Sequence, residues 1–188
     1  NLDYAIHPSE RGSSLEKEVF AWGKEQIMGH AKRTGEDFYG SVELFEDTPN
    51  AKRTMEHLVA LGFEKFDWSI IRFEKDLTQE FPPPELPDGF SIRSFRGERE
   101  VEAYVKLHRA AFESDAMTAA WRIRMLKHPT YLPEIDLVVV DTADRLVGFC
   151  VGWLWQGVGQ IEPLGVHPDY QGSGLGRALE LAALQALR

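Results

Sequence analysis

The spacing of apolar residues near the start of the chain predicts an amphipathic helix over residues 13–30. Leu15, Val19, Trp22 and Ile27 recur at intervals of three to five positions, so they fall roughly on one helical face. We expect that face to be buried.

Further elements in the first part of the chain follow from capping residues and from alternation. Asn50 is a suitable N-cap for a helix that continues through residue 61, and Gly62 is a suitable stop. Alternating apolar residues predict strands at residues 2–6, 38–45 and 66–73.

A second series of elements begins after residue 89. Thr118 is placed to cap a helix, and residues 141–145 are typical of a hairpin turn. The predicted strands are 90–95, 135–140, 146–154 and 160–166, and the predicted helices are 98–112, 118–126 and 175–188.

A proline-rich stretch separates the two series. Residues 81–89 read Phe-Pro-Pro-Pro-Glu-Leu-Pro-Asp-Gly, which is stiff, extended and incompatible with a helix. A ligand for a proline-recognising module is one interpretation, but a domain connector is the commoner one. The predicted organisation is therefore a first part over residues 1–76, a linker over 77–89 and a second part over 90–188.

Residues 160–188 carry the strongest signal for chemistry. A short apolar strand stops at His167-Pro168, and a loop with Gly172, Gly174 and Gly176 then opens a helix of strong helix formers. Glycines let backbone N–H groups converge, and a helix N-terminus carries a partial positive charge. This combination predicts a site for phosphate oxygens.

The spacing excludes two common phosphate-binding motifs. A Walker loop requires Gly-Lys-Ser/Thr, whereas Gly176 is followed by Arg177, and the dinucleotide fingerprint requires G-x-G-x-x-G directly after the strand. The pattern Gln171-x-x-Gly174-x-Gly176 resembles the acyl-CoA motif of the GNAT superfamily of N-acetyltransferases. The resemblance implies an α/β fold with a mixed, mostly antiparallel sheet flanked by helices, and acetyl-CoA as co-substrate.

Residues 4–15 resemble residues 164–175, at a constant offset of 160 positions. His, Pro, Gly, Ser and Leu coincide at five of the twelve positions, and chance similarity is the alternative to an internal repeat. In the first copy, Ser14 and Glu16 replace Gly174 and Gly176, so we expect that copy not to bind CoA. The chain is then similar in architecture to tandem GNAT proteins such as the mycothiol synthases, and it spans the second half of a degenerate repeat followed by the first half of a CoA-binding one.

The resemblance assigns roles to residues of the second copy. The family pairs the pantetheine arm with the strand before the motif, and it holds the pyrophosphate with N–H groups of the loop, which Gln171 would brace. A general base is also needed to take the amine proton, and Glu162 is the candidate, with a structural glutamate as the alternative. The expected cofactor-binding residues are Leu164, Gly165, Val166, Gln171, Gly172, Ser173, Gly174, Leu175, Gly176 and Arg177.

The composition of the chain bears on its binding partners and its cellular location. A net charge of −9 disfavours nucleic acid, and the sequence contains no apolar run long enough for a membrane span. The single cysteine, Cys150, excludes an internal disulfide and favours a cytoplasmic location. The scattered histidines give no support for a metal site.

Three hypotheses remain open at this point. The first is an acyltransferase that moves an acetyl group from acetyl-CoA to a primary amine of a small molecule or peptide. The second is a non-catalytic CoA-binding pseudoenzyme or scaffold module, and the third is an unrelated phosphate-binding α/β protein. Because each predicted half-repeat has unpaired sheet edges, self-association through those edges is a further expectation.

Overall fold

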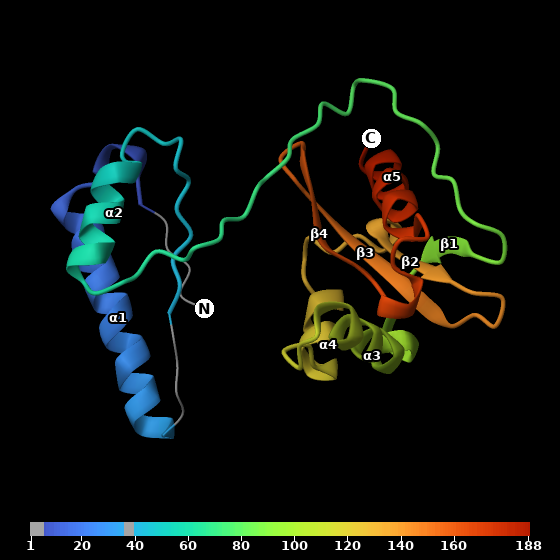
Figure 1. The fold of residues 1–188 in the computed structure, drawn as a ribbon, viewed down its shortest axis with the longest axis horizontal. Coiled ribbons are helices and arrows are strands. Elements are labelled where there is room, and N and C mark those ends of the chain that lie inside the picture. Colours follow the sequence, from blue (N-terminus) through green and yellow to red (C-terminus); the bar gives the residue numbers. More distant parts are fainter. Residues whose placement is uncertain (1–5, 36–39) are drawn as a thin grey trace. The chain divides into compact units, whose positions relative to one another are not determined.

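The computed structural model describes residues 6–35 and 40–188, which separate into two compact units. Unit 1 covers residues 1–72 and unit 2 covers residues 73–188. Unit 1 contains the helices α1 and α2, whereas unit 2 contains a four-stranded sheet with helices on both faces (Figure 1). The proline-rich stretch belongs to unit 2.

The two helices predicted in unit 1 are confirmed. Helix α1 (Ser14–Thr34) begins after Ser13, whose hydroxyl accepts the Leu15 N–H at 3.2 Å, and it ends at Gly35 in a left-handed conformation. Helix α2 (Ala51–Ala60) follows Asn50 and ends before Gly62, where φ is +83°. A short 3-10 turn, η1 (Pro8–Glu10), precedes α1.

Other expectations for unit 1 are wrong. The buried face of α1 is formed by Glu16, Phe20 and Gly23, whereas Leu15 and Trp22 are about half exposed. Residues 40–45 and 66–73 form no strand. Residues 1–5 and 36–39, which carry most of one predicted strand and the beginning of another, lie outside the described residues.

Unit 2 is organised around an antiparallel sheet with the order β1-β2-β3-β4. All its strand pairs are antiparallel, and the pairing of β2 with β3 forms the predicted hairpin. The strands are β1 (Ser91–Ser94), β2 (Asp136–Val140), β3 (Leu146–Trp155) and β4 (Val158–Val166).

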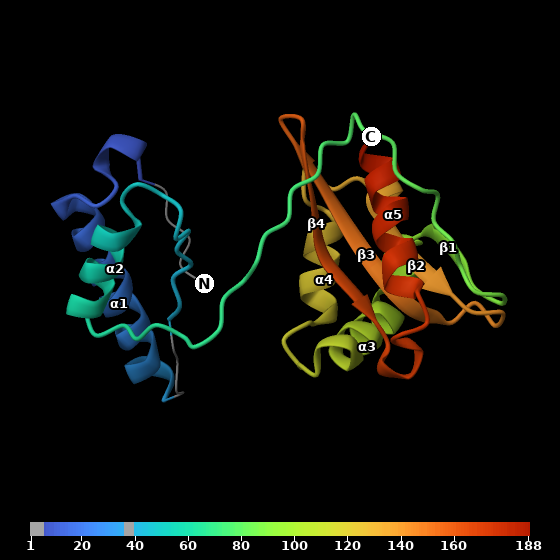
Figure 2. The same ribbon diagram turned by 45° about the horizontal axis from the view of Figure 1, so that its top comes forward.

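Helices cover both faces of this sheet. Helices α3 (Val101–Phe112) and α4 (Ala119–Leu126) pack on one face, and α5 (Leu175–Leu187) packs on the other (Figures 1 and 2). Alternation along β2 divides the core: Val138 faces α3 and α4, whereas Val139 faces α5. The expected GNAT-like α/β architecture is confirmed.

Short 3-10 turns and a charged network complete unit 2. The turns are η2 (Gly97–Glu100), η3 (Pro133–Ile135) and η4 (Pro168–Tyr170).

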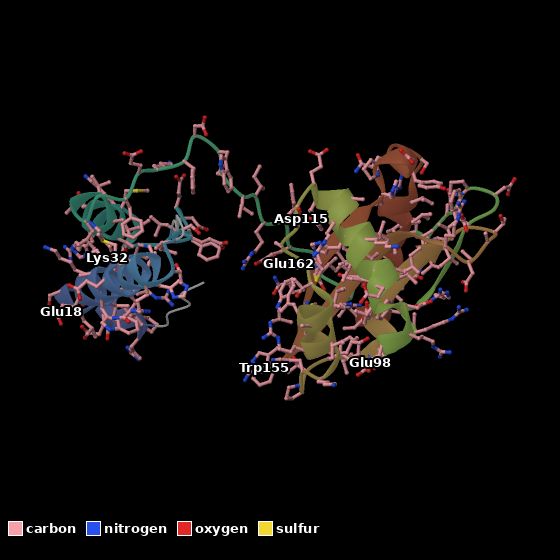
Figure 3. All side chains as sticks on the ribbon, turned by 90° about the horizontal axis from the view of Figure 1, so that it is seen from below. Glu18, Lys32, Glu98, Asp115, Trp155 and Glu162 are labelled. Atoms are coloured by element: carbon pink, nitrogen blue, oxygen red, sulfur yellow. The ribbon has the colours of Figure 1, made fainter. Side chains whose placement is uncertain are left out.

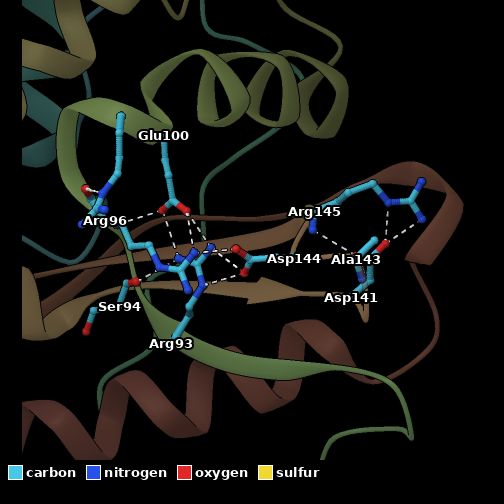
Figure 4. A network of polar contacts seen from close by, with 9 residues as sticks. Arg93, Ser94, Arg96, Glu100, Asp141, Ala143, Asp144 and Arg145 are labelled. Carbon is cyan, nitrogen blue, oxygen red and sulfur yellow. Dashed lines mark hydrogen bonds and ion pairs between the residues drawn. The ribbon is translucent and has the colours of Figure 1, made fainter.

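Arg93 of β1 donates two hydrogen bonds to Glu100 and two to Asp144 in the β2–β3 turn (Figure 4). The hydrogen bonds that Arg93 donates to the Glu100 carboxylate are the main reason why the pKa of Arg93 is raised. This network fixes the edge strand β1 to the start of α3.

His108 on α3 is a buried residue that packs among aromatic rings. Its ring stacks on Phe149, with the centroids 5.4 Å apart, and only 9% of the residue is exposed. Burial lowers the pKa of His108, and the nearby Arg122 guanidinium lowers it further.

We predict that unit 2 loses stability as the pH falls below about 6.5, the ordinary pKa of histidine. The folded state binds a proton at His108 less readily than the unfolded state does, so the His108 contribution is present above that pH and is lost below it. The loss is at most about 1.4 kcal/mol per pH unit. Urea unfolding between neutral and mildly acidic pH measures it. His108→Phe should flatten the dependence, and equal slopes in both proteins would contradict the prediction.

Candidate functional site

Strand β4 is an edge strand with a bulge at Glu162 and Pro163. On either side of the bulge, Leu164 is paired with Cys150 and Ile161 is paired with Gly152. The two residues between them therefore stand opposite the single β3 residue Val151. Pro163 has no N–H group to donate to the ladder, which suits a position in a bulge. A bulge bends its strand and turns backbone groups away from the ladder.

Gly165 allows the strand after the bulge to lie close to the core. A Cβ atom at this position would come within 2.5 Å of Phe149 Cζ and 3.1 Å of Ala111 Cβ. No larger residue fits without displacing the Phe149 ring. The spacing between β4 and α3 therefore depends on glycine at this position.

The loop after β4 is held by side-chain contacts to its own backbone. The His167 ring accepts a hydrogen bond from the Asp169 N–H at 3.3 Å, which starts η4. The Gln171 amide donates to the Val166 carbonyl at 3.1 Å, and the Ser173 hydroxyl donates to the Tyr170 carbonyl. These contacts fix the turn between β4 and α5.

The backbone N–H groups of residues 172–177 belong to the loop before α5 and to the first residues of that helix. Gly172 and Gly174 have φ values of +75° and +90°, and a Cβ atom on either one would meet nothing within 4 Å. Among the described residues, none of these six N–H groups has a hydrogen-bond acceptor. The loop therefore presents free donors, open space and the positive end of a helix dipole, which together suit an anionic phosphate group.

A pocket of about 190 Å³ lies beside the first two turns of α5. The proline-rich stretch forms one of its walls, and that stretch is anchored nearby by an edge-to-face contact between Phe90 and Tyr170. Both charges in the lining, Glu85 and Arg177, are on exposed residues. The lining residues are Pro82, Pro83, Glu85, Gly174, Arg177, Ala178 and Leu181.

No pattern in the sequence indicated that the proline-rich stretch would lie beside the loop. Pro82 and Gly174 are more than ninety positions apart in the sequence, and neither periodicity nor a motif relates them. The contact follows from the position of β1, because the stretch must run past α5 to enter the edge strand at Ser91.

Glu162 faces solvent rather than an apolar surrounding. Its carboxylate accepts a hydrogen bond from the Gln160 amide at 2.5 Å, and its backbone carbonyl accepts one from the Trp153 indole at 2.8 Å. The exposed carboxylate is labelled in Figure 3. The bulge thus presents an accessible base whose backbone is held by a tryptophan, while Gln160 lies against the carboxylate.

Aromatic residues that could contact an acceptor have different surroundings. Trp155, at the end of β3, is 65% exposed, and Trp121 on α4 is 44% exposed. Trp155 is labelled in Figure 3. The Tyr131 hydroxyl donates to the buried Asp136 carboxylate at 2.7 Å, so this partly buried tyrosine is attached to the start of β2. Among the described residues, no cluster of His, Cys, Asp and Glu could hold a metal ion.

Comparison with known proteins relates part of unit 2 to one family. The acetyltransferase (GNAT) family matches residues 99–188, which include β4, the loop and α5. This part of the chain is similar to the GNAT family. The match favours a GNAT-like domain over an unrelated phosphate-binding fold.

Two curated relatives of this chain are named mycothiol acetyltransferases. The protein from Thermobispora bispora is 35% identical over 64% of this chain and 44% of its own length. The protein from Saccharomonospora viridis is 28% identical over 97% of this chain and 60% of its own length. The chain therefore spans about half the length of the curated relatives it matches.

A solved structure supports the fold. The GCN5-related N-acetyltransferase from Sphaerobacter thermophilus matches with a TM-score of 0.66 and 22% identity, and the match covers 95% of this chain and 57% of that one. At this identity the likeness establishes the GNAT fold alone.

Proposed function

We propose that the protein carrying this chain transfers an acetyl group from acetyl-CoA to a primary amine, and that unit 2 binds the acetyl-CoA. The observation that carries the proposal is the set of unpaired N–H groups at residues 172–177, at the N-terminus of α5 and beside the bulged edge strand. These groups would hold the pyrophosphate. The outer edge of β4 near Leu164, Gly165 and Val166 is free among the described residues, so it can pair with the amides of the pantetheine arm.

Acetyl-CoA would supply a thioester whose carbonyl carbon the amine attacks, with the CoA thiolate as the leaving group. Glu162 would accept a proton from the attacking amine, directly or through a water molecule, as the new C–N bond forms and the C–S bond breaks. The hydrogen bond from Trp153 to the Glu162 carbonyl would hold the bulge in place during this step.

The acceptor that the proposal favours is a small molecule or peptide with a primary amine. The two relatives are named mycothiol acetyltransferases, which favours a small-molecule amine. The negative net charge of −9 also favours cationic acceptors over nucleic acid. A cytoplasmic location and self-association through the free β4 edge stay predictions.

Thermal unfolding in the presence of nucleotides tests the binding step. Acetyl-CoA should raise the unfolding midpoint of unit 2, whereas NAD and ATP at the same concentration should change it much less. A screen of primary amines for release of free CoA then tests transfer. No stabilisation by acetyl-CoA would contradict the proposal, and stabilisation without turnover on any amine would favour a non-catalytic CoA-binding module.

Glu162→Gln should lower kcat by about 100-fold or more with little change in acetyl-CoA affinity, because a general base is removed from an otherwise intact site. The acidic limb of the pH–rate profile should flatten as well. Glu102→Gln on the exposed face of α3 is the matched control. Wild-type rates across the pH range in Glu162→Gln would show that Glu162 has a structural role.

A further inference from the structure

The turn that precedes α1 in unit 1 has the same local geometry as the phosphate loop of unit 2. His7 and His167 have φ and ψ values of −52°, 138° and −53°, 137°, and each ring accepts the N–H two residues later. A 3-10 turn follows in both places, and then comes a glycine with positive φ, +76° at Gly12 and +75° at Gly172. The sequence similarity between residues 4–15 and 164–175 therefore extends to the backbone of the described residues.

The two loops differ in what lies in front of them. Gly172 faces open space, whereas Gly12 is buried under α2. A Cβ atom on Gly12 would lie 3.1 Å from Arg53 Cδ and 3.3 Å from Asn50 Cβ. In unit 1 the surface that would meet a phosphate is therefore an internal contact between two helices.

A carboxylate occupies this contact. Glu16 stands where unit 2 has Gly176, and its Oε2 atom accepts hydrogen bonds from the Gly12 N–H at 2.9 Å and from the Thr54 hydroxyl at 2.7 Å. Only 2% of Glu16 is exposed. The His57 Nδ1 atom is buried without a hydrogen-bond partner among the described residues, and it lies 4.0 Å from the same oxygen.

We propose that the Glu16 carboxylate is a built-in anion that fills the phosphate position of the unit 1 loop and joins α1 to α2. Removing it should expose a site for inorganic phosphate or pyrophosphate, formed by the Gly12 N–H, Thr54 and His57. It also follows that the chain binds acetyl-CoA at the unit 2 loop alone, a consequence that rests on the proposed function.

A simpler reading of Glu16 is a helix cap. Glutamate at the third helical position commonly accepts a backbone N–H near the N-cap, and Ser13-x-x-Glu16 fits that pattern. A cap explains the contact with Gly12. It does not require a hydroxyl and an imidazole from a second helix around the same carboxylate. The two readings differ in one consequence: a site built for an anion accepts another anion when its own is removed, and a cap does not.

Anion rescue of Glu16→Ala distinguishes the two readings. We expect this variant to unfold at a midpoint lower than wild type by about 5 °C or more, since the buried Gly12 N–H and Thr54 hydroxyl lose their hydrogen-bond acceptor. Sodium pyrophosphate should restore much of this loss, relative to sodium chloride at equal ionic strength. Wild type and Glu18→Ala, which removes an exposed glutamate of the same helix (Figure 3), should show no such gain. An equal response to pyrophosphate in all three proteins would overturn the proposal.

Refolding yields and calorimetry test the proposal if Glu16→Ala does not fold or if wild type binds no acetyl-CoA. If Glu16→Ala does not fold in chloride, its refolding yield with and without pyrophosphate gives the same comparison, and an unchanged yield overturns the proposal. Calorimetry of wild type with acetyl-CoA should give one site per chain, and two sites would also overturn it. If wild type binds no acetyl-CoA, the proposed function of unit 2 fails, while the pyrophosphate experiment still decides the role of Glu16.

Discussion

Gly174→Glu is expected to weaken acetyl-CoA binding by about 100-fold or more while unit 2 stays folded. The new carboxylate would stand at the N-terminus of α5, among the N–H groups proposed to hold the pyrophosphate, and like charges at short range repel strongly. The fold should tolerate the side chain, because a Cβ atom at this position meets nothing within 4 Å. Isothermal calorimetry with acetyl-CoA measures the effect.

The backbone at Gly174 requires a matched control. Its φ value of +90° is strained for any residue with a Cβ atom, at a cost of about 1–2 kcal/mol in stability. Gly174→Asn introduces a similar strain without a charge, and asparagine tolerates positive φ better than most residues. If Gly174→Asn loses as much affinity as Gly174→Glu, backbone geometry rather than charge is responsible. Unchanged affinity in Gly174→Glu would refute the assignment of the loop.

Asp136→Ala is expected to destabilise unit 2 by about 3–5 kcal/mol, the usual cost of leaving a buried charge without its partner. Asp136 and Arg122 are both fully buried and are joined by a 2.5 Å contact, and Tyr131 donates to the same carboxylate. Burial raises the pKa of Asp136, and the Arg122 guanidinium and the Tyr131 hydroxyl oppose that rise. The guanidinium also lies over the rings of Phe95 and Tyr104.

Urea unfolding of single and double variants tests the role of this pair. Replacing both residues with apolar ones, as in Arg122→Met with Asp136→Leu, should cost much less than either single change, because no unpaired charge remains. The pair connects α4 to the start of β2, so its loss should also loosen the helix that carries Trp121. A cost below about 1 kcal/mol for Asp136→Ala would show that water or a neighbouring group compensates the charge.

The local signals in the sequence predicted much of unit 2 correctly. Thr118 caps α4 with a hydrogen bond to the Trp121 N–H, and the hairpin and the helix from Leu175 are present. The strand predicted over residues 160–166 is present as part of β4, and it ends before Pro168 as expected. These features depend on caps, turns and proline, whose effects extend over a few residues.

The errors arise where the outcome depends on distant residues. Residues 66–73 alternate as a strand should, but a strand also needs a partner, and no strand is present in the described part of unit 1. Ile71 and Phe73 are exposed by 72% and 89% in consequence. The buried face of α1 was predicted wrongly because Glu16 is buried, and a pattern of apolar residues cannot indicate a buried glutamate.

In the candidate site, too, features that depend on residues distant in the sequence could not be predicted. The glycine loop could be recognised from residues 171–176 alone, because its geometry is set locally. The exposure of Glu162, the indole contact to its carbonyl and the proline-rich wall beside Arg177 depend on which segments meet in space. The burial of Glu16 in the first loop could not be predicted either, because Thr54 and His57, which contact its carboxylate, lie on α2.

The central claim is that unit 2 binds acetyl-CoA through the N–H groups of residues 172–177. Titration of acetyl-CoA into the isotope-labelled chain, followed by amide NMR, reports on these groups directly. We expect large shifts for the amides of Gly172, Gly174 and Gly176 and for β4 near Gly165, with no shift at Gly12. Shifts confined to other residues, or equal shifts at Gly12 and Gly172, would contradict it.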